Sequence, residues 1–361
     1  MAEIVVFVRS RPFFGAQLVM FPALYQLKQW WPHKRLRVVA RDDLRKLFES
    51  LPWVDEFVHA PTALTELAAL DRQCEVFVDL HPSSEWHALA ALLKHPPCRI
   101  GYRNGRVGDL VWTHALPFDA REYRALHFLH LLQAYRPFDA LRAAHGCVES
   151  LAAALPAHAG TASGTSRVDG AQGTRPMAAL ETGPVGGRLP HPRVVTFMPG
   201  GGAGEFKKWG MQRFVALADG LAEDAETAFN VILGPAEQEE ARMLRDMHRP
   251  DFRVVMSPSL SELARIIVAS DLVVANDCGP SHLAQCAAVP FVGLFDEDKP
   301  EWFWPRRDAC CLVPEPGCGL QSLPVPRVVE TCRVLLRTAT RVSETGQAET
   351  FRGAAEGSPV Q

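Results

Sequence analysis

Short apolar runs alternate with amphipathic stretches along the first third of the chain. Runs of strand length occupy 3–8, 36–40, 54–60, 75–80 and 98–102. Stretches with helical spacing separate them, at 15–31, 41–50, 62–73 and 84–95. Strands that alternate with helical segments of roughly 10–15 residues are typical of βαβ units, so this region predicts a parallel sheet covered by helices.

The same alternation returns in the second half of the chain. Strand-like runs occupy 193–200, 229–234, 252–257, 271–277 and 290–295, and helix-like stretches occupy 211–224, 236–248, 259–270 and 281–288. This predicts a second parallel α/β sheet. Open parallel sheets bind ligands at the carboxyl ends of their strands, so two such sheets in tandem predict a cleft where these ends face each other.

The periodicity disappears at two places. Residues 157–192 are rich in Gly, Ala, Ser, Thr and Pro, which predicts an interdomain linker or a mobile insertion. Residues 343–361 are polar and Gly-rich and are expected to form a disordered tail. The chain is therefore predicted to hold one Rossmann-like domain over 1–156 and another over 193–342.

Composition narrows the class of protein. The 361 residues are 47% hydrophobic and 22% charged with a net charge of −3, which gives no general reason to expect a nucleic-acid partner. The 9 cysteines form no C-x-x-C pair, so zinc-site spacing is missing and reduced thiols in a cytoplasm are expected. The apolar run 4–8 is too short for a signal peptide, and no apolar stretch approaches the ~20 residues that span a bilayer. Any membrane contact would be peripheral.

A glycine-rich stretch, "FMPGGGAGEFKKWG", follows the first strand of the second half. Glycines such as Gly201 let backbone amides approach an anion, and Lys207 or Lys208 would add positive charge. The order of residues fits neither a Walker A loop nor a dinucleotide-binding fingerprint. Phosphate binding and a flexible turn with exposed lysines both remain open.

A carboxylate follows the next strand, in "VILGPAEQEEARM". Glu237 lies just past the strand end, where its side chain could accept two hydrogen bonds from a ribose diol. The alternative is that Glu237 only favours the start of a helix through the helix dipole.

A third polar group, "NDCGPSHLA", follows the buried run 272–275. Asp277 ends the predicted strand, and Gly279, Pro280 and Ser281 lead into a helix whose first turn contains His282. Backbone amides at a helix start bind anions, and a histidine can donate to a phosphate oxygen. Alternatively, Asp277 or Ser281 caps the helix. Together the glycine loop, the carboxylate and this helix start would suit a nucleotide diphosphate.

These segments resemble the ADP-heptose:lipopolysaccharide heptosyltransferases, glycosyltransferase family 9. The resemblance rests on "PGGGAGEFKKWGMQRFVALADGL", "VILGPAEQEE" and "LARIIVASDLVVANDCGPSHLAQCAAVPFVGLF", with "VFVDLHPSSEWHALAALL" and "FGAQLVMFPALYQLKQWWPHKRLRVVA" in the first half. It covers nearly everything except the linker and the tail. It implies a GT-B fold, with an acceptor-side N-terminal domain and a nucleotide-sugar-binding C-terminal domain facing a central cleft.

The resemblance also implies roles for particular residues. Lys207 would contact the phosphates, with Lys208 as its substitute, and Glu237 would hold the ribose. Asp277, Gly279 and His282 would surround the diphosphate and the sugar. The motifs themselves add Gly201, Pro280 and Ser281 as candidate nucleotide-binding positions. The implied reaction moves a heptose or related sugar from an ADP-activated donor to a lipopolysaccharide core or other glycan. It would invert the anomeric carbon and would use no metal and no cofactor. The implied location is the cytoplasm, with peripheral contact to the inner membrane.

One departure from the family affects the chemistry. The family typically has Gly-Asp after the first strand, with the Asp as general base, and this chain has Gly15-Ala16. Alanine accepts no proton, so Asp79 and His81, at the end of another strand, become the candidate catalytic residues. His81 could instead only line an acceptor cleft.

Several alternatives stay open. One is a catalytically impaired nucleotide-sugar-binding homologue, and another is an epimerase of the same architecture. An oxidoreductase is disfavoured because no G-x-G-x-x-G follows the first strand.

Asp296 and Asp298 resemble a metal-binding D-x-D pair, but a lysine and a helix dipole can replace the metal. Aromatic clusters at 29–35 and 300–307 could pack domain surfaces or contact a glycolipid.

Overall fold

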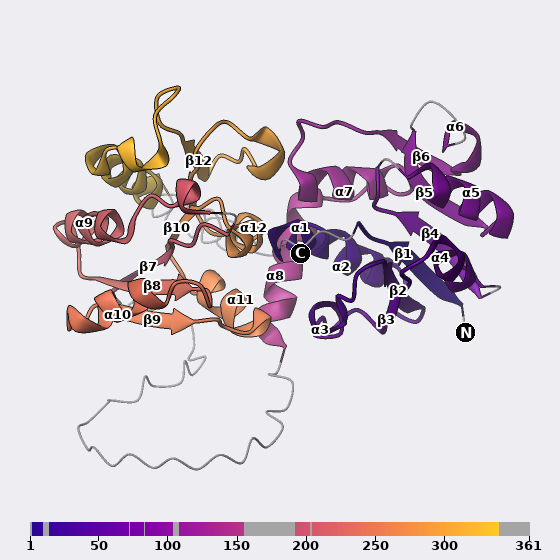
Figure 1. The fold of residues 1–361 in the computed structure, drawn as a ribbon, viewed down its shortest axis with the longest axis horizontal. Coiled ribbons are helices and arrows are strands. Elements are labelled where there is room, and N and C mark those ends of the chain that lie inside the picture. The colour runs from indigo at the N-terminus through magenta and orange to yellow at the C-terminus, as the bar shows by residue number, and fades with distance from the viewer. Residues whose placement is uncertain are drawn as a thin grey trace, which may run out of the picture.

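The computed structural model describes residues 2–9, 14–71, 73–82, 84–103, 108–154, 192–202 and 204–338. Within this part of the chain there are two parallel six-stranded sheets, one from each half of the sequence. Figure 1 shows the two sheets with their helices side by side, with α1, α8 and α12 between them. The predicted linker at 157–192, apart from Pro192, and the predicted tail at 343–361 lie outside the described residues.

The first sheet has the strand order β3-β2-β1-β4-β5-β6. Its strands are β1 Glu3–Phe7, β2 Arg35–Ala40, β3 Glu56–His59, β4 Cys74–Asp79, β5 Cys98–Arg103 and β6 His114–Pro117. Its helices are α1 Phe14–Leu18, α2 Phe21–Trp30, α3 Arg45–Phe48, α4 Ala63–Ala69, α5 Glu85–Lys94, α6 Gly108–Val111, α7 Arg124–Gln133 and α8 Ala140–Ala153. This is the doubly wound order in which ligands bind where the strand order reverses.

The second sheet repeats that order as β12-β11-β10-β7-β8-β9. Its strands are β7 Arg193–Met198, β8 Thr227–Leu233, β9 Phe252–Met256, β10 Leu272–Asn276, β11 Phe291–Leu294 and β12 Ala309–Leu312. Its α-helices are α9 Met211–Ala222, α10 Gln238–Asp246, α11 Leu260–Val268 and α12 Gly279–Gln285, followed by a helix over 325–338. Short 3-10 turns are η1 Glu205–Lys207, η2 Pro300–Trp302 and η3 Leu320–Ser322. β7 and β10 pair at the centre, so their ends lie at the reversal point.

The two parallel sheets are confirmed, and three details of the expected elements were wrong. The helix expected over 15–31 is two helices, because Pro22 lacks an N–H and starts α2 as a new helix. The helix expected over 41–50 is only the single turn α3. The sixth strand of each sheet, β6 and β12, was not expected. Both are 4-residue edge strands, with the sequences HALP and ACCL, and neither contains a β-branched or aromatic residue of the kind that marks a strand.

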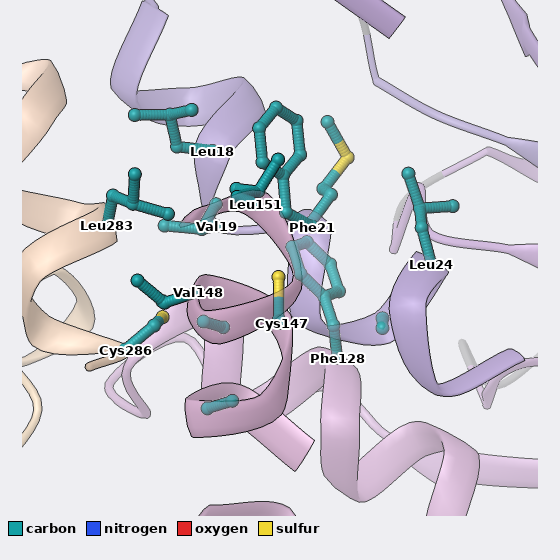
Figure 2. Close-up of a cluster of buried hydrophobic side chains, with 14 of the residues drawn as sticks. Leu18, Val19, Phe21, Leu24, Phe128, Cys147, Val148, Leu151, Leu283 and Cys286 are labelled. Atoms are coloured by element: carbon teal, nitrogen blue, oxygen red, sulfur yellow. The ribbon is translucent and has the colours of Figure 1, made fainter. Parts of the chain in front are cut away.

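One apolar core joins the two halves. Helix α8 comes from the first half but packs against both α2 and α11. Figure 2 shows Val19 of the α1–α2 turn and Val148 of α8 facing Leu283 and Cys286 at the end of α12. All of these side chains are buried. The packing brings the start of α1 against the start of α12, beside the point where the second sheet's strand order reverses.

No helix within the described residues is long and apolar enough to cross a membrane.

Candidate functional site

A cavity of about 710 Å³ opens between α1 and the carboxyl ends of β7, β8, β9 and β10. We call it the cleft cavity. Its polar lining includes Lys207, Glu237, Asp277 and His282, and its apolar lining includes Ile232, Pro258, Leu263 and Trp302. Backbone from Gly200, Gly202, Gly234 and Gly279 also faces it, as do Phe14, Gly15 and Ala16 of α1. The structure therefore brings the three sequence-predicted polar groups to one cavity, which has the size of a small-molecule site.

Lys207 lies at the end of the glycine-rich loop. Gly202 has a φ of +47° in this loop, a conformation that glycine adopts without strain. A Cβ on Gly201 would lie 2.6 Å from the carbonyl oxygen of Gly204, so the loop folds tightly on itself there. Gly201 itself does not line the cavity. The loop delivers Lys207 into the cavity, where its Nζ forms an ion pair with Asp277.

Lys208 is adjacent in sequence but points elsewhere. Its Nζ lies 2.7 Å from Glu205, 3.0 Å from Glu240 and 3.8 Å from Glu237. Burial opposes its charge, but hydrogen bonds to Glu205 and Glu240 prevail and raise the pKa of Lys208. It is not among the cavity-lining residues. Of the two candidate lysines, only Lys207 is placed to meet a ligand in the cleft cavity.

Glu237 immediately precedes α10 and reaches back toward the end of β8. Its Oε2 accepts a hydrogen bond from the backbone N–H of Gly234 at 2.9 Å. The side chain is largely buried yet lines the cavity. A Cβ on Gly200 would lie 3.4 Å from Oε1, so the glycine loop passes directly over the carboxylate. The hydrogen bond from Gly234 therefore fixes Oε2 in place. The Glu237 carboxylate still lines the cavity and can bind a ligand there.

The segment from Asp277 to His282 forms the far wall of the cavity. No described side chain caps α12: the N-cap residue is Cys278, and Ser281 Oγ donates to the Cys278 carbonyl at 2.7 Å. The sequence-based alternative, a cap by Asp277 or Ser281, is therefore wrong. Ser281 is buried beneath the cavity, whereas Pro280 lines it. The backbone N–H of Gly279, the first residue of α12, has no described side-chain acceptor, whereas Pro280 has no N–H and the Ser281 N–H donates to the Cys278 carbonyl at 3.2 Å.

Two glycines allow α1 and α12 to approach closely at this wall. A Cβ on Gly15 would lie 2.7 Å from Cδ2 of His282, and a Cβ on Gly279 would lie 2.8 Å from Cδ1 of Phe14. His282 is buried, and this burial lowers its pKa to about 4; Asp277 opposes the effect and Lys207 adds to it. At neutral pH His282 is therefore an uncharged ring that can donate one hydrogen bond from one nitrogen.

Asp79 and His81 lie at the end of β4, outside the lining of the cleft cavity. Asp79 is 2% exposed, and its Oδ1 accepts from the His81 backbone N–H and from His87 Nδ1, both at 2.9 Å. Asp79 thus holds two groups in place. Burial lowers the pKa of His81, and its Nδ1 has no hydrogen-bond partner in the described part of the chain. Of the two, His81 has the ring nitrogen that is not engaged by a described residue, but that nitrogen is buried.

Sequence reasoning missed the partners of Asp79. His87 on α5 also lies 3.4 Å from Glu66 Oε1, and Glu66 accepts two bonds of 2.9 Å from Arg41. Burial opposes the charge on His87, but Asp79 and Glu66 outweigh it and raise the pKa to about 9. Burial opposes the charge on Glu66 as well, yet His87 and Arg41 lower its pKa to about 2. These residues come from different helices and loops, so no local pattern could have linked them.

Sequence reasoning also left the apolar part of the cleft cavity unassigned. Ile232, Pro258 and Leu263 line one side of it, and Trp302 lines another. The only sequence signal was the aromatic cluster at 300–307. Trp302 packs on the His282 ring with 5.3 Å between centroids, while Trp30 and Trp31 pack on Tyr135 away from the cavity.

The first aspartate of the D-x-D pair, Asp296, is engaged in a local ion pair. Lys299 Nζ lies 2.9 Å from Asp296 Oδ1 and 3.2 Å from Glu297 Oε1. Among the described residues there is no group of three or more His, Cys, Asp or Glu side chains suited to hold a metal ion.

Comparison with solved structures shows the fold. The structure of E. coli ADP-heptose LPS heptosyltransferase II matches with a TM-score of 0.57 and 17% identity, over 93% of this chain and 99% of that one. E. coli heptosyltransferase WaaC with ADP matches with a TM-score of 0.60 and 14% identity, over 92% and 99%. UDP-GlcNAc 2-epimerase from Methanocaldococcus jannaschii matches with a TM-score of 0.53 and 10% identity, over 92% of both chains. The GT-B prediction is confirmed, but this fold includes transferases and epimerases alike.

The sequence comparisons distinguish between them. A search of curated proteins finds no match. The sequence model of glycosyltransferase family 9 (heptosyltransferase) matches residues 78–316, a span that runs from β4 through the cleft cavity to β12. Because that match covers more than half of its length, this chain belongs to glycosyltransferase family 9 and is a glycosyltransferase.

Proposed function

We propose that this glycosyltransferase takes its sugar, a heptose or a close relative, from an ADP-activated donor held in the cleft cavity. The observation that carries the proposal is the convergence of Lys207, Glu237 and the uncapped start of α12 on that one cavity. A lysine together with the Gly279 N–H at the start of α12 suits a diphosphate, and a carboxylate suits a ribose diol. The apolar side chains of Ile232 and Pro258, which line the same cavity as Glu237, suit a purine base.

The proposed acceptor is a glycan hydroxyl of a lipopolysaccharide core. Its oxygen attacks the anomeric carbon from the face opposite the diphosphate, so that the new C–O bond forms as the bond to the diphosphate breaks. Inversion follows from this geometry. Negative charge grows on the leaving ADP, and Lys207 and the Gly279 N–H would stabilise it without a metal ion. The acceptor's proton would pass to a general base, for which we propose His81.

A second candidate function is favoured by Ala16. Its side chain lines the cleft cavity at the position where the resemblance implies an aspartate base. If no other residue replaces that base, the chain would bind the nucleotide sugar without transferring it. The cytoplasmic location and the peripheral membrane contact expected from the sequence belong to the proposal in either case.

The test is a donor and acceptor screen with the purified full chain. ADP and UDP binding are measured by calorimetry, and products from ADP-heptose or UDP-sugars with a lipopolysaccharide-core acceptor are identified by mass spectrometry. Transfer from ADP-heptose that persists in EDTA supports the proposal. ADP binding without transfer supports the binding-only alternative. Absence of ADP binding, or transfer from a UDP-sugar instead, contradicts the assignment of the donor.

A further inference from the structure

Gln285 is a buried side chain at the end of α12, one turn after His282. It is 1% exposed and does not line the cleft cavity. The backbone N–H of Trp304 donates to Gln285 Oε1 at 2.8 Å, and Gln285 Nε2 donates to the carbonyl oxygen of Trp302 at 3.1 Å. A backbone N–H can only donate and a carbonyl can only accept. These two contacts therefore determine which end of the Gln285 amide is oxygen and which is nitrogen.

The orientation of the amide determines where His282 carries its proton. Gln285 Nε2 also lies 3.3 Å from His282 Nδ1. An amide nitrogen has no acceptor capacity, so the contact is a hydrogen bond only if Nδ1 is unprotonated. A neutral imidazole with a bare Nδ1 carries its hydrogen on Nε2. A Cβ on Gly15 would lie 3.2 Å from that Nε2, so this nitrogen is at the α1 side of the cavity wall.

The other groups around His282 are consistent with a neutral ring that carries its hydrogen on Nε2. The burial that lowers the pKa of His282 to about 4 keeps the ring neutral at physiological pH, so it has one N–H rather than two. The charged groups that act on it are Asp277 and Lys207, which pair with each other. The ring of Trp302, 5.3 Å away, and that of Tyr123, 6.3 Å away, flank the imidazole and limit its rotation.

We propose that Gln285 is a positioning residue that holds His282 with its proton on Nε2, so that the ring donates a hydrogen bond into the cleft cavity. The identity of the acceptor, an oxygen of a diphosphate-linked sugar, rests on the proposed function. The tautomer of His282 does not depend on the proposed function. With the proton on Nδ1, two buried donors would face each other without an acceptor, which is unfavourable. The pairing resembles the outer contacts that fix the tautomer of functional histidines in other proteins.

The first test reads the tautomer directly. The full chain is labelled with ¹⁵N-histidine, and the His282 signals among those of 13 histidines are assigned by their loss in His282→Asn. We expect Nδ1 to resonate as an unprotonated nitrogen and Nε2 to carry the hydrogen. A protonated Nδ1 in the unmodified protein would overturn the proposal.

A variant of the same shape reverses the hydrogen bond. Gln285→Glu keeps an acceptor for Trp304 and, once its carboxyl is ionised, presents an oxygen to His282, so at a pH where it is ionised the His282 proton is expected on Nδ1, with a corresponding shift of its resonance. Gln26→Glu, at another buried glutamine, is the matched control and should leave the His282 signals unchanged. An Nδ1 that remains unprotonated while the introduced carboxyl is ionised, as read from the carboxyl's ¹³C resonance, would contradict the inference.

The second test separates positioning from a general structural role. Gln285→Met removes the amide at similar volume, and we expect it to weaken ADP binding by about fivefold, the effect of one neutral hydrogen bond. In a His282→Asn background the same change should weaken ADP binding less than it does in the unmodified protein, because the part of the loss that passes through His282 is already gone there. Additive losses in calorimetry would overturn the proposal. If the unmodified protein binds no ADP, the proposed donor fails, while the tautomer measurement still decides the role of Gln285.

Discussion

Two adjacent lysines offer the sharpest test of how the cleft cavity would hold a nucleotide. Lys207 and Lys208 are 17% and 15% exposed, so they are equally buried, yet only Lys207 lines the cavity. A hydrogen bond from a charged donor contributes about 1.5–3 kcal/mol. Because each 1.4 kcal/mol is roughly a factor of ten, Lys207→Met should raise the Kd for ADP by about 10–150-fold. The Asp277 carboxylate, left without its partner, would repel the diphosphate and push the loss toward the upper end.

Lys208→Met is the matched control. It removes the same charge one residue away, from a site already surrounded by Glu205, Glu237 and Glu240. We expect the Kd for ADP to change by less than about threefold, since no contact with the nucleotide is lost. Calorimetry measures both affinities, and thermal unfolding checks that each variant is folded. Equal losses in the two variants, or a larger loss for Lys208→Met, would refute the reasoning.

Three further predictions concern the cavity wall and the first sheet. Gly15→Ala places a Cβ 2.7 Å from the His282 ring. It should therefore lower the free energy of unfolding by about 1–3 kcal/mol and weaken ADP binding, and an unchanged melting temperature and affinity would contradict the close approach. His87 gains its proton affinity on folding, since its pKa is raised from 6.5 to about 9. The contribution of protonated His87 to the free energy of unfolding, about 3 kcal/mol, should be complete below pH 6.5 and lost as pH rises through 9. Denaturant unfolding should show that loss in the native protein and not in His87→Gln. His81→Ala should lower turnover sharply and leave ADP affinity intact, and unchanged turnover would remove His81 from the mechanism.

The fold was predictable from the sequence where burial is complete. Central strands such as β1 and β10 are buried along their whole length, so they appear as continuous apolar runs. The edge strands β6 and β12 have partly exposed residues and contain no β-branched or aromatic side chain of the kind that marks a strand, which leaves no strand pattern to detect. The break between α1 and α2 was also readable in principle, from Pro22.

The candidate site, like the fold, was predictable from the sequence only in part. Three polar groups after three strands were visible in the sequence because parallel strands end at one edge, and the cleft cavity brings them together. The sequence could not tell Lys207 from Lys208, nor place Ser281 beneath the cavity and Asp79 in a buried network. Those distinctions depend on the direction of each side chain, which neighbours far away in sequence decide.

The two parallel sheets and the polar residues at their strand ends follow from the local sequence, because the alternation of buried and exposed positions and the position of a residue after a strand are local properties of the chain. Only the tertiary structure decided how the sheets are joined through α8 and α12, and which nitrogen of His282 can carry its proton. Both depend on contacts between distant segments, where packing and hydrogen bonds to Gln285 and Trp304 select one arrangement among those that the local sequence allows.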